Sequence, residues 1–287
     1  MSNSYLKRIA AINDISGVGK CSLTVALPVV SASGVECSCL PTTVLSTHTC
    51  EFKGFTLRDL SDDIVPVAEH WAHEKVHFDG ICSGYMANAG QAKLIYEAIQ
   101  LIKSEDTLIV VDPAMADNGA YYAMLGDDIR DEFRSLCAIA DIITPNVTEA
   151  AFLAGIPYMA PPHTTEYVEG LLAALAKMGP KIVAVTSIYQ KDGQVGNIAL
   201  DTVTGKIYRS MRPAFEGSFH GAGDVFTAAF ASLIVRGADI GAAMDVSGEL
   251  VGDSISRTVE RGAPRHYGVD FESALPTYIQ KVAKLFE

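Results

Sequence analysis

The chain has 287 residues, enough to bury a large core in one α/β domain or in two smaller ones. Its formal net charge of −12 opposes a nucleic-acid surface, which needs clustered lysine and arginine, and no apolar run reaches the roughly 20 residues of a membrane span. The first residues, MSNSYLKR, lack the apolar segment of a secretory signal, and the six cysteines form no C-x-x-C pair. We therefore expect a cytoplasmic protein with reduced thiols.

Apolar runs alternate with segments of helical periodicity through the first two thirds of the chain. The apolar runs predict strands at 6–13, 35–40, 76–82, 107–112, 139–144 and 181–187. The periodic segments predict helices at 21–33, 59–74, 88–103, 146–154 and 165–178. This alternation predicts an α/β fold with a mostly parallel sheet and helices on both of its faces.

The pattern changes near residue 190. Residues 195–211 are predicted to form an antiparallel hairpin around the DTVTG turn. Helical segments then follow to the end of the chain, at 223–236, 239–259 and 271–286. Because there is no repeat, low-complexity tract or linker, we expect a single domain over residues 1–287.

The stretch DISGVGKCSLT, from Asp14 to Thr24, contains a Gly-Lys pair and raises the question of a Walker nucleotide loop. That motif needs a glycine where this chain has Asp14 and a hydroxyl residue where it has Cys21. We therefore expect a strand–helix turn that lines a site at the carboxyl end of the first strand. The turn also lacks G-x-G-x-x-G, which disfavours a dinucleotide-dependent enzyme.

One pair of cysteines and one group of three histidines are weak candidates for metal sites. Cys37 and Cys39 lie on a predicted strand, where we expect them to face opposite sides. His70, His73 and His77 have helical spacing, but the helix is expected to end near His73. Neither group therefore predicts a metal site.

The most informative stretch is SFHGAGDVF, where Gly221, Ala222 and Gly223 form a short turn and Asp224 opens an apolar helix. Glycine permits backbone angles that let N–H groups converge, and a helix start adds unpaired N–H donors and a partial positive charge. Together they make an anion hole suited to a phosphoryl group. A carboxylate beside such a hole can take a proton from an attacking hydroxyl, although an aspartate at a helix start can also be only a cap.

This stretch resembles the G-[AT]-G-D signature of the ribokinase superfamily. The resemblance implies a three-layer α/β/α ribokinase-like fold with a helical C-terminus. It also implies that Asp224 is the base that deprotonates the acceptor hydroxyl, and that Gly221, Ala222 and Gly223 form the anion hole.

Two further segments match the same superfamily in order. TPNVTEA resembles its Asn-x-x-Glu segment, here Asn146 and Glu149, which implies that Glu149 helps to organise Mg²⁺ beside the ATP phosphates. The same pair also reads as a helix start with Asn146 as N-cap and Glu149 three residues on. DPAMAD resembles the Asp-Pro-x-x-x-Asp segment of the vitamin-kinase branch, which implies that Asp112 and Asp117 lie near the phosphates and the metal.

The nucleotide contacts implied by the resemblance extend beyond these motifs. The residues after Asp117, through Tyr122, are implied to form a flap over ATP, and Thr186 and Ser187 in AVTS are implied to contact the nucleotide. His220, just before the glycine turn, lines the nucleotide pocket or only fills a loop. The implied cofactors are ATP and Mg²⁺, and dependence on a monovalent cation is left open.

The acceptor site resembles that of pyridoxal kinases. An H-T pair implies that Thr49 meets a pyridine ring, a G-Y pair implies that Tyr85 lies beside it, and Leu45 is an apolar ring neighbour. Asp14 falls about where many pyridoxal kinases have a serine, and a carboxylate there favours a protonated ring nitrogen or a cationic amine. STHTCEFKGF also resembles a bacterial pyridoxamine kinase-like subgroup.

The resemblance implies an ATP-dependent kinase that phosphorylates the 5′-hydroxymethyl group of a B6 vitamer: pyridoxal, pyridoxamine or pyridoxine. The alternatives are a hydroxymethylpyrimidine kinase with the same chemistry, and a non-catalytic vitamer-binding protein on the same fold. The second is opposed by the presence together of Asp224, Glu149 and the glycine turn. The family also implies a homodimer, with no nucleic-acid or membrane partner.

Overall fold

The computed structural model describes residues 6–123 and 125–287. Its main sheet has nine strands in the order β11-β10-β9-β8-β5-β4-β1-β2-β3. The strands of this sheet are β1 (Arg8–Val18), β2 (Glu36–Thr47), β3 (Leu57–Asp59), β4 (Gly80–Ser83), β5 (Leu108–Val111), β8 (Ile142–Ile143), β9 (Ile182–Tyr189), β10 (Gln194–Asp201) and β11 (Ile207–Pro213). A separate two-stranded hairpin joins β6 (Ala116–Asp117) and β7 (Ala120–Tyr121).

The pairing pattern explains why ligands can gather at one edge of this sheet. The six strands from β9 through β1 to β2 are parallel to one another, whereas β3, β10 and β11 pair antiparallel at the two flanks. The predicted mostly parallel sheet and the antiparallel hairpin are confirmed. Parallel strands present their carboxyl ends, and the loops that follow them, along a common edge.

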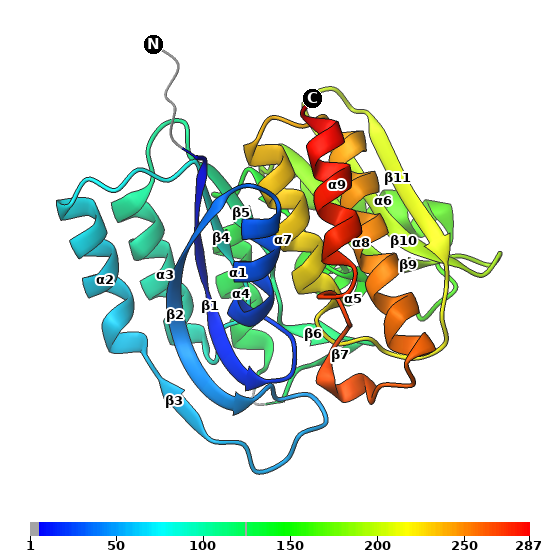
Figure 1. Cartoon of the computed structure of the whole chain (residues 1–287), viewed down its shortest axis with the longest axis horizontal. Helices are drawn as coiled ribbons and strands as arrows, with labels where there is room; N and C mark the ends of the chain where they lie inside the picture. Colours follow the sequence, from blue (N-terminus) through cyan, green and yellow to red (C-terminus); the bar gives the residue numbers. More distant parts are fainter. Residues whose placement is uncertain (1–5, 124) are drawn as a thin grey trace.

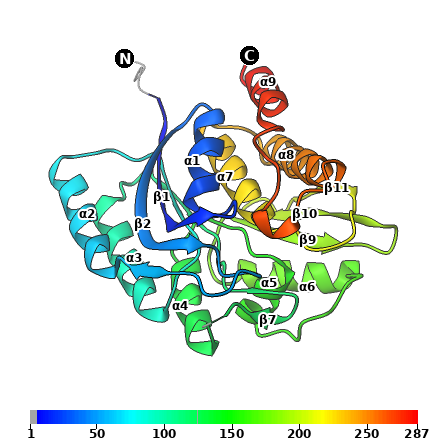
Figure 2. The same ribbon diagram turned by 60° about the horizontal axis from the view of Figure 1, so that its bottom comes forward.

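Helices cover both faces of the sheet (Figures 1 and 2). One face packs on α2 (Ser61–His73), α3 (Ala89–Ile102), α4 (Asp127–Cys137), α5 (Val147–Ala154) and α6 (Thr165–Ala176). The other packs on α1 (Leu23–Ala32), α7 (Ala222–Val235), α8 (Ile240–Glu260) and α9 (Leu275–Leu285). A short 3₁₀ turn, η1, spans Arg265–Tyr267. The result is the predicted three-layer α/β/α fold with a helical C-terminus.

The central strands are apolar throughout because both of their faces are covered. Val110 and Val111 on β5 are fully buried, one in each of the two hydrophobic clusters on either side of the sheet. Ile9 and Ile12 on β1 divide in the same way. The sheet, whose central strands are buried on both faces, is a rigid base for the polar loops at its carboxyl edge.

Some elements were not predicted. Helix α4 was missed because its DDIRDEFRSLC sequence is mostly charged, yet Ile129, Phe133 and Leu136 recur at helical spacing and are buried. Strand β2 continues to Thr47, well past the predicted end at residue 40, because β1 runs beside it as far as Val18. Pairing with β1 thus extends β2 through residues that form no apolar run.

The expectation that Cys37 and Cys39 face opposite sides of their strand was wrong. Residues two apart on a strand point to the same face, and each of the two thiols shifts the pKa of the other. Within residues 6–123 and 125–287, no group of three or more His, Cys, Asp or Glu side chains is arranged to hold a metal ion. Nor does any helix in those ranges have the length and apolarity to cross a membrane.

Candidate active site

A cavity of about 180 Å³ opens at the carboxyl edge of the parallel strands. It brings together segments from β1, β2, β4, β5, β9 and the start of α7. All of the site residues predicted from the sequence line it: Asp14, Leu45, Thr49, Tyr85, Asp112, Asp117, Tyr122, Asn146, Glu149, Thr186, Ser187, Gly221, Ala222, Gly223 and Asp224. Residues up to 210 positions apart in the sequence thus meet in one hollow.

One end of the cavity is the turn that opens α7. Gly221 is the N-cap of the helix and has a positive φ of 78°, which L side chains rarely adopt. A Cβ on Gly221 would also collide with the carbonyl oxygen of Lys20, whereas a Cβ on Gly223 would meet nothing within 4 Å. The Ala222 N–H donates to the Phe219 carbonyl at 3.4 Å, and Gly221, Ala222 and Gly223 all line the cavity. The first N–H groups of a helix have no partner within the helix, so those of this turn can serve a ligand.

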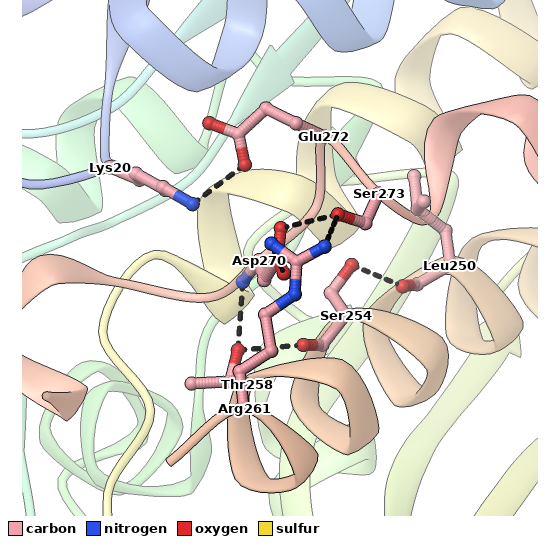
Figure 3. A network of polar contacts seen from close by, with 8 residues as sticks. All are labelled: Lys20, Leu250, Ser254, Thr258, Arg261, Asp270, Glu272 and Ser273. Carbon is pink, nitrogen blue, oxygen red and sulfur yellow. Dashed lines mark hydrogen bonds and ion pairs between the residues drawn. The ribbon is translucent and has the colours of Figure 1, made fainter. Parts of the chain in front are cut away.

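The loop behind this turn is fixed by a network of polar contacts (Figure 3). Lys20 Nζ lies 2.7 Å from Glu272 Oε2, so its side chain forms an ion pair and does not line the cavity. Arg261 Nη1 lies 2.8 Å from Asp270 Oδ2, and the Asp270 N–H donates to Thr258 Oγ1 at 2.8 Å. Helix α8 thereby holds the segment after η1, which in turn holds the loop at Lys20.

Carboxyl groups are crowded in the cavity. Burial raises the pKa of Asp224 well above its ordinary value, and the nearby charges of Asp112 and Asp14 raise it further. Burial likewise raises the pKa of Asp112 to about 7, and that of Glu149, which also lies near Asp112, well above its usual range. Burial and mutual repulsion thus raise the pKa values of these carboxyl groups together, and such a site favours a nearby cation.

The Asn-x-x-Glu segment forms the predicted helix start. Asn146 caps α5, and Glu149 completes a capping box by accepting from the Asn146 N–H at 2.8 Å. The second carboxylate oxygen of Glu149 accepts from the Met115 N–H at 3.1 Å, and Asn146 Nδ2 donates to the Ala116 carbonyl at 2.8 Å. The capping interpretation is confirmed, and the pair also anchors the β6–β7 hairpin.

The β6–β7 hairpin and the end of β9 form a second wall. Asp117 closes β6, and burial raises its pKa. Tyr122 follows β7, and its N–H donates to the Met115 carbonyl at 2.9 Å. Thr186 bridges to Asn146, and Ser187 has a positive φ of 58°, which turns the chain at the cavity.

The other end of the cavity carries polar atoms without partners. Asp14 is 3% exposed; its Oδ2 accepts from Ser16 at 3.0 Å, but its Oδ1 has no hydrogen-bond partner. The Tyr85 hydroxyl is likewise buried without a partner, and burial raises its pKa to about 12. Leu45 adds an apolar surface beside Thr49. Unpaired buried groups of this kind suit a polar ring that would complete their hydrogen bonds.

Several lining residues were not predicted as site residues. Ser22 lines the cavity, and its backbone tends to lower the pKa of Asp224. Cys50 and His48 also line it, and His220, for which two interpretations were open, does so as well. The sequence signal available for these residues was only their proximity to matched motifs.

A second cavity of about 540 Å³ adjoins the first, and the two share Asp117, Ser187, Ser218, Phe219 and Ala222. Most of its remaining lining comes from β10, β11, the segment after β11 and α8, with Asn118, Pro161 and Tyr189 beside them. The apolar members are Val195, Phe215, Val251 and Ile255. A larger, partly apolar hollow next to an anion hole fits a nucleotide better than a second vitamin.

Comparison with known proteins gives a consistent result. The family model described as phosphomethylpyrimidine kinase matches residues 26–269. The pyridoxal kinase PdxY of Leifsonia xyli is 30% identical over 192 residues, which cover 64% of this chain and 65% of that protein.

Solved structures extend the likeness to nearly the full length. A Bacteroides thetaiotaomicron protein, provisionally named phosphomethylpyrimidine kinase and solved with pyridoxal, is 31% identical, with a TM-score of 0.90 and 96% of each chain covered. Pyridoxal kinase from Lactobacillus plantarum is 29% identical, with a TM-score of 0.87, covering 96% of this chain and 98% of that one.

The three-layer fold, with a glycine turn and a half-buried aspartate at the start of α7, defines the class as a small-molecule kinase of the ribokinase superfamily. The chain belongs to the phosphomethylpyrimidine kinase family and, within it, groups with the pyridoxal kinases. The resemblance noted from the sequence motifs is confirmed.

Proposed function

We propose that the chain folds as a single kinase domain and transfers the γ-phosphoryl group of ATP to the 5′-hydroxymethyl group of a B6 vitamer, giving the 5′-phosphate and ADP. The observation that carries this proposal is one cavity with the glycine turn and Asp224 at one end and the unpartnered Asp14 and Tyr85 atoms at the other. The similarity to a protein solved with pyridoxal supports the choice of acceptor.

In this mechanism Asp224 is the general base. Its carboxylate accepts the proton of the 5′-hydroxyl while that oxygen forms a bond to the γ-phosphorus and the bond from phosphorus to the ADP oxygen breaks. The N–H groups of the turn at 221–223 bind the oxygens of the group in transfer. The rigid sheet edge keeps acceptor and donor aligned, and this positioning supplies much of the rate.

The residues present fit Mg²⁺, because hard carboxylate oxygens are the ligands that this ion prefers. Asp117 and Glu149 are the proposed ligands, with Glu149 acting through water because both of its oxygens already accept backbone hydrogen bonds. In the described ranges no three acidic or histidine side chains form a closed metal site, which is consistent with an ion held chiefly by phosphates and water. When bound, Mg²⁺ neutralises phosphate charge.

The nucleotide is proposed to lie across the two cavities. Thr186 and Ser187 would contact its phosphates from β9, Asp112 and Asn146 would face them from the sheet edge, and Tyr122 belongs to the flap beside them. The adenosine part would occupy the adjoining 540 Å³ hollow.

The acceptor ring is proposed to lie among Asp14, Leu45, Thr49 and Tyr85. A buried carboxyl with one free oxygen suits a protonated ring nitrogen or the amine of pyridoxamine, so we favour the pyridoxamine kinase-like subgroup. The second candidate is hydroxymethylpyrimidine phosphorylation, which the description of the matching family favours. A non-catalytic vitamer-binding protein is disfavoured by the complete arrangement of base and anion hole.

The test is a competition. Pyridoxal, pyridoxamine, pyridoxine and hydroxymethylpyrimidine are mixed at equal concentration with Mg-ATP and the enzyme, and the monophosphates are quantified by mass spectrometry. Because the acceptors compete, product ratios give the ratios of kcat/KM. A dominant B6 phosphate supports the proposal, a dominant pyrimidine phosphate supports the second candidate, and ATP binding without any product supports a binding protein.

We further propose a cytoplasmic homodimer. All six cysteines are free thiols, which supports a reducing compartment. Light scattering coupled to size exclusion tests the dimer, which a mass near 30.6 kDa would contradict. Dependence on a monovalent cation is tested by replacing K⁺ with tetramethylammonium in the assay buffer.

A further inference from the structure

The catalytic cavity has an unusual balance of charge for a site proposed to bind ATP. Among the described residues that line it are five carboxyl side chains, Asp14, Asp112, Asp117, Glu149 and Asp224, and no lysine or arginine. Lys20, whose backbone lies against Gly221, forms an ion pair with Glu272 outside the cavity. Kinases usually place a cationic side chain at the phosphates, so another group is needed to supply that charge.

Two histidines line the cavity, and one of them is held as a cation. His220 lies directly before Gly221, with its Nε2 3.0 Å from Glu51 Oε1. The Cys50 thiol, also in the lining, lies close enough to the same ring to influence its pKa. Cys50 and Glu51 both come from the segment after β2, so that segment surrounds the His220 ring with two potential anions.

The thiol and the imidazole stabilise each other's charged forms. The hydrogen bond to Cys50, with that to Glu51, raises the pKa of His220 to about 9 against the effect of burial. Burial alone would raise the pKa of Cys50, but the hydrogen bonds to His220 and His48 outweigh it and lower that pKa to about 7. Near neutral pH, Cys50 and His220 therefore form a thiolate–imidazolium pair at the edge of the anion hole.

We propose that His220 is a further catalytic residue, whose imidazolium donates a hydrogen bond to the phosphoryl group during its transfer. This inference rests on the proposed kinase function. His220 is one residue before the glycine turn, so its ring and the turn's N–H groups face the same anion. A preorganised cation at developing negative charge is among the strongest devices that enzymes use.

The arrangement leaves one N–H of His220 available to a substrate. The Glu51 side chain is 59% exposed, so its pairing with His220 competes with water and is weak. A phosphoryl oxygen can replace Glu51 as the partner of Nε2, while Cys50 continues to favour the charged form of the ring. Other titratable groups facing His220 are His48, from the same segment, and Asp117, from β6.

The experiment compares His220→Gln with the wild type across pH 6–10, using Mg-ATP and the preferred vitamer. Glutamine keeps a hydrogen-bond donor but removes the charge, so kcat is expected to fall about 10²-fold, with the KM for the vitamer changed little. Wild-type kcat is expected to decline above about pH 9, where the imidazolium loses its proton. The variant should lack that alkaline decline.

A matched control is His77→Gln, which removes a histidine that faces a carboxylate, Asp79, on the surface far from the cavity. Its kinetics should equal those of the wild type. His220→Lys, which restores a positive charge, is expected to recover part of kcat and to extend activity to higher pH. Thermal melting of each variant establishes that it is folded.

A binding measurement does not depend on any variant. The wild-type affinity for Mg-ADP with fluoroaluminate, which mimics the group in transfer, should weaken about tenfold more than that for Mg-ADP alone between pH 7.5 and 10. Equal weakening of the two, or a His220→Gln variant that keeps wild-type kcat and the alkaline decline, would overturn the role of His220. A wild type inactive on every vitamer would instead refute the proposed function.

Discussion

The two glycines in the turn that opens α7 differ in whether their positions can accept a side chain. Gly221 has a positive φ and lies against the Lys20 carbonyl, so Gly221→Ala is expected to distort the turn, lower Tm by several degrees and abolish turnover. Gly223 has open space around its Cβ position, so Gly223→Ala should melt like the wild type. Thermal melting with an ADP-release assay distinguishes them, and equal melting temperatures for both variants would contradict this account of Gly221.

The free oxygen of Asp14 is expected to select among the vitamers. Asp14→Ser replaces the carboxyl by the residue type that many pyridoxal kinases have there, and it removes a charge-assisted hydrogen bond worth roughly 1.5–3 kcal/mol. The kcat/KM for pyridoxamine should therefore fall at least about tenfold, by more than that for pyridoxal. An unchanged ratio of the two efficiencies would mean that Asp14 does not contact the amine or the ring.

At the residue scale, the sequence predicted the site residues that belong to short motifs. It missed the residues that only the fold brings next to those motifs. The spacing of Asn146 and Glu149 indicated a helix cap by itself, and the resemblance of the G-x-G-D turn to a known signature singled out Asp224. His220 and Cys50 lie 170 positions apart, and their pairing depends on how the segment after β2 lies over the start of α7. No local pattern in a single sequence contains that contact.

At the element scale, the segment after η1 links α8 to the loop behind the anion hole. Asp270→Ala removes the buried partner of Arg261 and Ser273, so we expect a loss of about 1–3 kcal/mol in the free energy of unfolding. A looser Lys20 loop should also raise the KM for ATP. Denaturant unfolding and steady-state kinetics measure the two effects.

The control at this scale is Glu272→Gln. It breaks the Lys20 ion pair, whose partners are 32% and 53% exposed, so the change in unfolding free energy should stay within about 0.5 kcal/mol. If Glu272→Gln proves as costly as Asp270→Ala, the contact of the buried Asp270 with the exposed Arg261 is not what holds the segment.

Element prediction succeeded where periodicity was strong and failed where pairing decided the structure. The buried parallel strands carry continuous apolar runs, so their existence could be inferred. The β6–β7 hairpin has two residues in each strand, and it is held by the Glu149 and Asn146 side chains more than by its own sequence. Strand β3 is fully exposed and exists because it pairs with β2.

At the scale of the whole molecule, the crowded carboxyl groups make stability depend on pH. The pKa of Asp112 is raised from 3.8 to about 7, so the folded state keeps a proton that the unfolded chain has released. The free energy of unfolding must therefore fall as pH rises from about 4 to about 7. Asp112→Asn lacks this fall and should be more stable than the wild type at pH 8, by about 1 kcal/mol after allowance for water in the cavity.

Thermal melting at pH 5 and pH 8 tests this expectation. The difference in Tm between Asp112→Asn and the wild type should grow by a few degrees from the lower to the higher pH. A difference that is constant, or that shrinks with rising pH, would show that Asp112 is ionised throughout.

The central claim is that Asp224 removes the proton of the acceptor hydroxyl at the anion hole, and turnover by Asp224→Asn tests it most directly. The amide preserves the shape of the half-buried side chain, so folding and Mg-ADP binding should be nearly unchanged. ADP release with the preferred vitamer should fall about 10²- to 10⁴-fold, the usual contribution of a general base. Near-normal turnover by a folded, nucleotide-binding Asp224→Asn variant would contradict the claim.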